Sequence, residues 1–432
     1  MLSAKKEKFM RVWINTLLFL SITVFLVSRS SYAIPLSLLA ITALIYYFYD
    51  LVFAQRFEVS VASCRQDYGK MIIGFLLFFG ISVFFYIYHQ ESASFLDKPS
   101  RLIAFSLVLL LLLRYPPQTD VLLIAINLAA IVAGCVAIYQ VYYLSIGRAF
   151  YKMLAIQGGD IAMSLGLFSV FIGSYALYAK KRIILLFSLL GSVLGIFASF
   201  LSASRGGWLC LPLLALMLLC FYRKKITAKG TLIALLTGAV VAGFFVTNPK
   251  LPKRVYQAYH EVQMYYGGAA KNTSVGRRLE LWKSAVYAWQ EKPVLGWGKK
   301  GIKTARQAQE KDKRVIANLH KTKLHTHNQF LEELSVRGMV GFIIFILFLA
   351  IPLWVFAKYR HHEKADVRLI SHLGMLHVFL VVTYCLTQNF FAHNSGMMFY
   401  ALMIVVFYSA LAGAVHTESG VDSVFAGQGM IR

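Results

Sequence analysis

Charged residues are scarce in this sequence: Asp, Glu, Lys and Arg make up only 15% of its 432 residues, whereas 58% are apolar. A soluble globular domain usually has about 25% charged and about 45–50% apolar residues, so this class is excluded. The aromatic content of 15% excludes an intrinsically disordered chain as well. Because a bilayer-spanning helix needs roughly 20 apolar residues, the composition predicts an all-α, polytopic membrane protein.

The chain also lacks the patterns that build disulfide frameworks and zinc sites. None of its five cysteines is part of a C-x-x-C pair, and four of them lie in apolar runs. The segments predicted to face outward contain no D-x-D or D-x-E pair of carboxylates. Since a metal-dependent phosphosugar site normally needs such carboxylates, we expect no catalytic metal and no other cofactor.

Apolar runs divide the chain into about twelve predicted transmembrane helices. They cover residues 12–28, 33–54, 71–89, 99–113, 121–142, 159–178, 182–202, 207–222, 230–247, 338–357, 369–388 and 396–415. This pattern predicts three regions within one integral membrane domain. Residues 1–247 hold helices one to nine, residues 248–337 form a large loop, and residues 338–432 hold helices ten to twelve and a tail.

Lys and Arg in the short loops predict the orientation of the chain in the membrane. With a cytoplasmic N-terminus, the predicted cytoplasmic segments hold 20 of these residues and the short outer loops hold six. This bias predicts cytoplasmic N- and C-termini, because positive charge is retained on the inner side. The net charge of +25 would indicate nucleic acid binding in a soluble protein. Here topology explains much of it, so we expect no nucleic acid partner.

The loop at residues 248–337 falls on the outer side and is strongly basic. It contains 18 Lys or Arg and seven Asp or Glu. A loop of this length is usually functional, and its charge predicts an anionic partner such as phosphate. Leu279, Trp282, Val286 and Trp289 recur at helical spacing and predict an amphipathic helix, which Pro293, Gly296, Gly298 and Gly301 should end. A helix is also predicted over 255–266, and another from Asn328, its N-cap, to Arg337.

Arg205 is the first candidate for chemistry, in Ser-Ala-Ser-Arg-Gly-Gly-Trp at residues 202–208. An arginine at a membrane junction is costly and indicates function, although an interfacial arginine in a tight turn is the structural alternative. Ser204 and the adjacent glycines allow close backbone approach to an anion. Arg277 and Arg278 are further candidates, because a guanidinium binds phosphate oxygens in pairs. Their structural alternatives are a solvated basic face and an ion pair with Glu280.

His327 is the candidate base, in His325-Thr326-His327-Asn328 before predicted helix ten. A histidine titrates near neutral pH and can take a proton from a hydroxyl group. The alternatives are a capping or interfacial histidine, and a metal ligand together with His325. His393 and Asn394, in the last outer loop, could line the same cavity or have structural roles.

Three motifs give the chain a resemblance to the O-antigen ligase (WaaL) family of the O-antigen ligase/polymerase superfamily. They are Ser-Arg-Gly-Gly at 204–207, Gly-Arg-Arg-Leu-Glu-Leu-Trp at 276–282, and His327-Asn328 followed after nine residues by Gly338-Met339-Val340-Gly341. The predicted layout of helices and loop is similar too. The resemblance implies a GT-C-type glycosyltransferase of the bacterial inner membrane with its active site at the periplasmic face.

The implied reaction moves O-antigen polysaccharide from undecaprenyl pyrophosphate to a sugar hydroxyl of lipid A–core, without metal and with inversion. The resemblance assigns catalytic roles to His327, Arg205 and Arg278. It leaves Arg277, Ser204, His325, Asn328 and His393 to bind the pyrophosphate or the acceptor. The doubled arginine leaves open whether Arg277 or Arg278 is the functional one.

Three alternative functions are considered for this sequence. An O-antigen polymerase would use the same donor but extend the lipid-linked chain, and a protein O-oligosaccharyltransferase would use a Ser or Thr acceptor. A membrane transporter would place more charge inside its spans, where Asp50 and the junctional Arg205 stand out.

Overall fold

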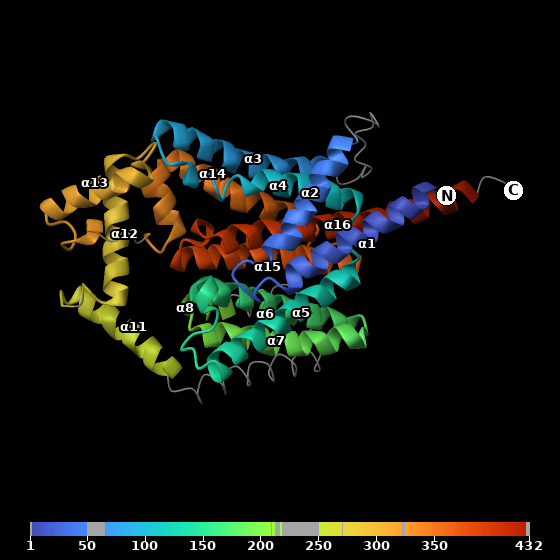
Figure 1. Cartoon of the computed structure of the whole chain (residues 1–432), viewed down its shortest axis with the longest axis horizontal. Helices are drawn as coiled ribbons and strands as arrows, with labels where there is room; N and C mark the ends of the chain where they lie inside the picture. Colours follow the sequence, from blue (N-terminus) through green and yellow to red (C-terminus); the bar gives the residue numbers. More distant parts are fainter. Residues whose placement is uncertain are drawn as a thin grey trace.

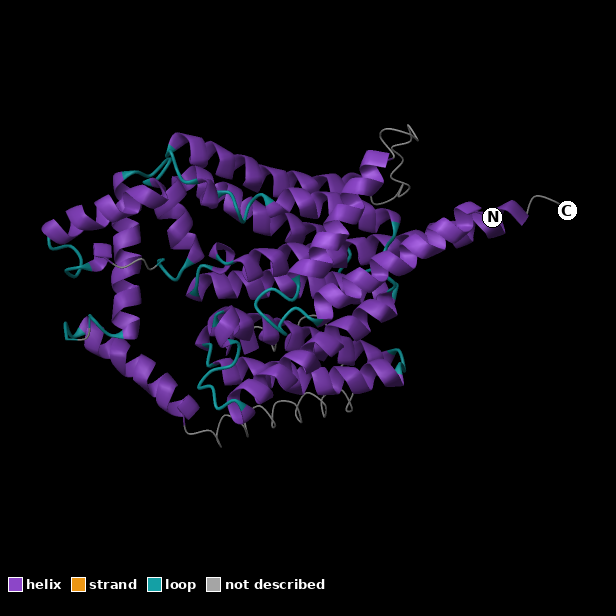
Figure 2. Ribbon diagram, in the orientation of Figure 1, coloured by secondary structure: helices purple, strands orange, loops and turns teal. Residues whose placement is uncertain are grey.

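The computed structural model describes residues 2–49, 65–208, 210, 211, 217, 250–269, 271–321 and 325–428. Over these residues the chain forms helices and connecting loops and no β-strand, which confirms the all-α prediction (Figure 2). The predicted spans at 207–222 and 230–247, and the end of the predicted span at 33–54, lie largely or wholly outside the described residues.

The long helices follow the predicted apolar runs closely, with ends that differ by several residues. They are α1 (Leu2–Thr23), α2 (Ala33–Tyr49), α3 (Arg65–Tyr88), α4 (Arg101–Arg114), α5 (Thr119–Ile138), α6 (Ala155–Tyr178), α7 (Arg182–Ser202), α8 (Arg205–Trp208), α11 (Lys250–Tyr266), α12 (Ser274–Glu291), α13 (Gly298–Lys311), α14 (Gln329–Lys358), α15 (Ala365–Thr387) and α16 (Asn394–Gln428).

Seven of the described helices are long and apolar enough to cross a membrane, namely α3, α5, α6, α7, α14, α15 and α16. The chain is therefore a multi-pass membrane protein. The number twelve is not reached within the described residues. Helix α2 is apolar but has 17 residues, and α4 has 14.

Helices α6, α15 and α16 form the centre of the bundle. In each of them 78% of the apolar window is buried, against 33% in α3 and 39% in α14, which lie toward the outside. Helices α5 and α7 pack on α6, while α14 and α4 connect α3 to α15 and α16. Small residues allow close contact between α6 and α7, since a Cβ on Gly195 of α7 would lie 2.8 Å from the Cα of Gly166 in α6.

The segment predicted as a large loop folds into three helices, α11, α12 and α13, at one end of the bundle (Figure 1). Helix α1 begins and α16 ends at the opposite end (Figure 1). Two helix predictions are confirmed: α12 carries the amphipathic pattern around Trp282, and α11 includes 255–266. Helix α12 ends at Glu291, directly before the predicted Pro and Gly residues, and Gly298 and Gly301 belong to the next helix, α13.

Helix α14 is interrupted at Gly338, the residue at which the tenth span is predicted to begin. Gly338 has φ 63° and ψ −163°, a backbone conformation that is essentially restricted to glycine. The turn after α12 forms backbone hydrogen bonds with α14 around this interruption. Met339 N donates to Pro293 O at 2.8 Å, and Trp297 N donates to Ser335 O at 3.0 Å. This contact holds the end of α12 against α14.

We expect Gly338→Ala to destabilise the fold by about 3 kcal/mol, because it combines a strained φ with a collision. A Cβ there would lie 2.3 Å from Val294 O. The measurement is the thermal unfolding midpoint of the purified protein in detergent. Gly80→Ala in α3 is the matched control, since a Cβ at Gly80 meets nothing within 4 Å. Equal midpoints for the two variants would contradict the role of this junction.

Candidate functional site

Helix α12 presents Arg278 and Trp282 on one face, because residues four apart on a helix lie above one another. The Trp282 indole Nε1–H donates to the backbone oxygen of Thr326 at 2.8 Å. Helix α12 therefore rests directly on the loop that precedes α14. Arg278, one turn before Trp282, is partly buried, whereas the adjacent Arg277 is exposed. The structure thus separates two arginines that are neighbours in sequence.

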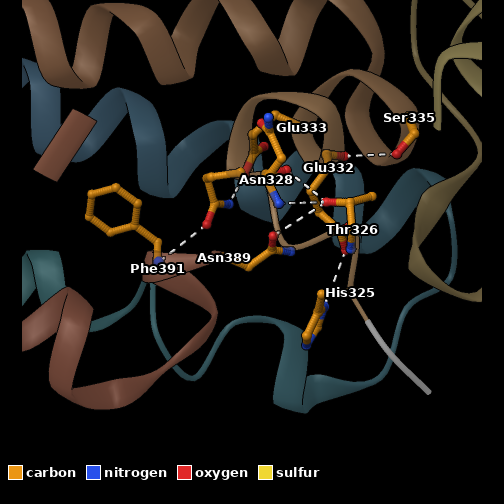
Figure 3. A network of polar contacts seen from close by, with 9 residues as sticks. His325, Thr326, Asn328, Glu332, Glu333, Ser335, Asn389 and Phe391 are labelled. Carbon is orange, nitrogen blue, oxygen red and sulfur yellow. Dashed lines mark hydrogen bonds and ion pairs between the residues drawn. The ribbon is translucent and has the colours of Figure 1, made fainter. Parts of the chain in front are cut away.

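The loop at residues 325–328 is held through Thr326, which is only 1% exposed. Its N–H donates to Glu332 Oε2 at 3.1 Å, and its hydroxyl donates to Asn328 O at 2.7 Å (Figure 3). His327 sits between these anchors with φ 55°, in the left-handed region that non-glycine residues rarely adopt. The surrounding bonds therefore support a strained backbone at His327, a pattern that clusters at functional sites.

His327 lies in a basic and partly desolvated environment. Burial lowers the pKa of His327 to about 4, and the positive charge of Arg278 acts in the same direction, against the negative charge of Glu332. The imidazole is therefore neutral near pH 7 and has a free lone pair to accept a proton. The neighbours Arg278, His325 and His393 come from α12, the 325–328 loop and the connection between α15 and α16.

Two further histidines complete this cluster. Burial also lowers the pKa of His393 to about 4, and His325 and Lys98 contribute to the shift. His325 is oriented by Glu332, whose Oε1 lies 3.2 Å from His325 Nδ1 (Figure 3). A buried arginine of α13, Arg306, interacts with the same carboxylate of Glu332. One acidic side chain thus stabilises several basic groups at the edge of the site.

Asn328 begins α14, as predicted. Its side-chain oxygen accepts from the N–H groups of Phe330 at 3.0 Å and Leu331 at 3.2 Å, which confirms the N-cap. The two glutamates that follow point in different directions, as adjacent helical residues do. Glu332 binds His325 and Thr326, whereas Glu333 binds Gln329 at 2.8 Å and Arg337 at 3.0 Å.

The Arg205 junction lies at the end of the bundle that faces α11–α13 (Figure 1). Helix α7 ends at Ser202, Ala203 has φ 55°, and α8 begins at Arg205. The Arg205 side chain is outside what the structure describes. Ser204 is buried, and its hydroxyl donates to Asp160 Oδ1 at 2.9 Å. The Ser204 side chain therefore binds protein here, although it was predicted to bind substrate.

The glycines of this junction allow close packing of helices. A Cβ on Gly206 would lie 2.3 Å from Thr387 Oγ1 of α15, and one on Gly207 would lie 3.1 Å from Asp160 Oδ1 of α6. Helix α8 consequently packs against both α6 and α15. In the sequence these glycines indicated close approach of an anion, and in the structure they provide close approach of protein atoms.

Several polar residues near the site had no place among the residues predicted from the sequence. They are Asp160, Arg306, Glu332, Gln388 and Asn389. Asp160 could have been predicted from the sequence, because it is an acidic residue inside an apolar span and such residues are usually functional or paired. The remainder are ordinary polar residues whose importance depends on which helices meet.

The structure therefore brings Arg278, His325, His327, Asn328 and His393 together around one loop. It places Arg205 and Ser204 at a separate junction, on the same end of the bundle (Figure 1). Arg277, on the same helix as Arg278, is exposed.

Comparison with known proteins gives three similarities. A family model described as O-antigen ligase matches residues 190–346, which include α8, α11–α13 and the start of α14. An uncharacterized protein of Haemophilus influenzae is 32% identical over 409 residues, covering 93% of this chain and 99% of that protein. A protein of Escherichia coli K12 named O-antigen ligase is 24% identical over 257 residues, covering 55% of this chain and 58% of that protein.

We expect Arg278→Ala to raise the pKa of His327, because it removes a nearby positive charge. Arg277→Ala is the matched control and should leave this pKa unchanged, since Arg277 is exposed. The measurement is a pH titration of histidine-labelled protein by NMR, with the His327 signal assigned from a His327→Gln variant. Equal shifts in the two arginine variants would show that Arg278 is not the nearer charge.

Proposed function

The chain belongs to the O-antigen ligase family, and on this basis we propose that it transfers O-antigen polysaccharide from undecaprenyl pyrophosphate to a sugar hydroxyl of lipid A–core. The family consists of glycosyltransferase-like ligases and polymerases, and the E. coli relative is named a ligase. The observation that carries the proposal is the meeting of a partly buried arginine, Arg278, with a neutral histidine, His327. This pair combines an anion-binding group with a proton acceptor.

The donor would be held by its pyrophosphate. Arg278 and Arg205 would bind the phosphate oxygens and stabilise the negative charge that develops as the glycosidic bond breaks. Partial burial of Arg278 strengthens this interaction, because a lower dielectric increases the attraction between opposite charges. The exposure of Arg277 favours Arg278 as the functional member of the doubled arginine.

His327 would act as the general base. Its neutral imidazole would remove the proton of the acceptor hydroxyl while the hydroxyl oxygen attacks the anomeric carbon. The bond from that carbon to the pyrophosphate oxygen would break, and undecaprenyl pyrophosphate would leave as the anion. A single displacement of this kind inverts the anomeric configuration. His325, Asn328 and His393 would line the acceptor side, and no metal or cofactor is assigned a role.

The position of the site within the cell follows from the proposed topology. The start of α1 and the end of α16 lie at one end of the bundle, and α11–α13 lie at the other (Figure 1). With Lys and Arg concentrated in the predicted cytoplasmic loops, we assign the chain ends to the cytoplasm and α11–α13 to the periplasm of the inner membrane. The basic surface of α11–α13 would then attract phosphorylated lipopolysaccharide core.

The proposal is tested by deleting the gene in its native host and examining lipopolysaccharide and lipid-linked glycan together. We expect core-only lipopolysaccharide and long polymer retained on undecaprenyl pyrophosphate. Complementation with Arg205→Ala, Arg278→Ala or His327→Ala should reduce ligation at least tenfold, whereas Arg277→Ala should restore it. Core that carries a single repeat unit would instead identify a polymerase. An unchanged profile would remove both enzyme assignments and favour a transporter.

The pH dependence of the reaction tests the role of His327. With a pKa of about 4, His327 stays neutral at pH 5.5, so kcat/KM should remain nearly constant between pH 7.5 and 5.5. A base with the ordinary histidine pKa of about 6.5 would retain only about a tenth of its activity at pH 5.5. In Arg278→Ala the acid limb should move to higher pH. A tenfold fall in the wild-type protein by pH 5.5 would contradict the assignment.

A further inference from the structure

Asp160 is a fully buried acidic residue in a membrane-spanning helix, α6. A carboxylate at such a place is costly and persists only with strong partners or a function. The proposed reaction uses Arg278, Arg205 and His327 and assigns nothing to Asp160. Its contacts, however, connect the two parts of the candidate site.

The Asp160 side chain accepts hydrogen bonds from two residues of the Arg205 junction. Asp160 Oδ1 accepts from the Ser204 hydroxyl at 2.9 Å, and the carboxylate also accepts from the backbone N–H of Gly207. These donors stand immediately before and two residues after Arg205. The carboxylate thereby fixes the start of α8 from both sides, whichever way the arginine side chain extends.

The other oxygen of Asp160 accepts a hydrogen bond from the connection between α15 and α16, residues 388–393. Gln388 Nε2 donates to Asp160 Oδ2 and also to Gln157 Oε1 at 3.3 Å. Gln157 Nε2 in turn donates to Phe390 O at 2.8 Å. Asp160 and Gln157 are both on α6, so this helix is hydrogen-bonded to the connection at two places.

The same connection supports the His327 loop. Asn389 Oδ1 lies 3.3 Å from the Thr326 hydroxyl, and Phe391 N donates to Gln329 Oε1 at 3.2 Å (Figure 3). Thr326 and Gln329 flank His327 and Asn328 in the chain. A continuous set of buried hydrogen bonds thus runs from the Arg205 junction through Asp160 and residues 388–391 to the loop of the proposed base.

We propose that Asp160 is a positioning residue that sets the Arg205 junction, and through it the donor pyrophosphate, relative to the His327 loop. This inference rests on the proposed function. The carboxyl group of Asp160 suits the task because three donors, from Ser204, Gly207 and Gln388, converge on its two oxygens.

The test measures binding and kinetics of the full-length protein in nanodiscs. Undecaprenyl pyrophosphate is the binding probe, and the KM values for lipid-linked donor and for lipid A–core are measured separately. Asp160→Ala should weaken carrier binding and raise the donor KM about tenfold while leaving the acceptor KM unchanged. Asp160→Asn keeps one acceptor oxygen for Ser204 and Gly207, and should restore both values to within about threefold of wild type.

Two more variants keep the test decisive if Asp160→Ala does not fold. Ser204→Ala removes only the hydroxyl that Asp160 binds, and should raise the donor KM about threefold. Ser169→Ala is the control, since Ser169 is buried in the same helix but its hydroxyl donates to Leu165 O at 3.0 Å. It should change neither KM. Ser204→Ala with an unchanged donor KM would overturn the inference.

The outcomes separate this inference from the function on which it rests. Wild-type protein that neither binds undecaprenyl pyrophosphate nor transfers glycan from it would overturn both. Wild-type protein that does both, with Asp160→Ala binding the carrier equally well, would overturn only the role of Asp160. An equal change in both KM values, or a loss of folded protein that Asp160→Asn does not rescue, would mark Asp160 as structural and overturn it as well.

Discussion

Polar groups buried among apolar helices must find hydrogen-bond partners, and this requirement determines where the backbone of the candidate site lies. Away from water an unpaired polar group costs about 1–3 kcal/mol, so buried groups in the bundle occur in connected sets. Asp160, Gln157 and Gln388 form one such set, and Thr326, Gln329 and Asn389 extend it. The short connection at residues 388–393 belongs to both sets and links the two parts of the site.

The charges of the side chains around residues 325–328 determine which ligands the candidate site can bind. Arg278 and three histidines converge at residues 325–328 and 393, with Glu332 as a nearby carboxylate. His327 and His393 are partly removed from water, and burial lowers the pKa of each to about 4, so both remain neutral near pH 7. The result is a site that combines a permanent cation with neutral proton acceptors. An anionic donor and a hydroxyl acceptor are the pair of substrates that such an arrangement suits.

Regular spacing and capping residues made several elements predictable. The pattern of Leu279, Trp282 and Val286 predicted α12, and Asn328 predicted the start of α14, because both signals depend on neighbours within one helix. The special position of Gly338 was also visible. The different environments of Arg277 and Arg278 were not, since they depend on the direction in which α12 packs against the 325–328 loop. Asp160 was overlooked although its place within an apolar run was a usable signal.

The sequence by itself determined that this chain is an all-helical membrane protein, which motifs it carries and which family it belongs to, because hydropathy, helical period and motif order are local properties. Only the tertiary structure decided which residues share a site. His393 is 66 positions from His327, and Asp160 is 44 positions from Ser204. Their meeting is a consequence of helix packing, in which α6, α15 and α12 bring distant polar residues together so that each finds a partner away from water.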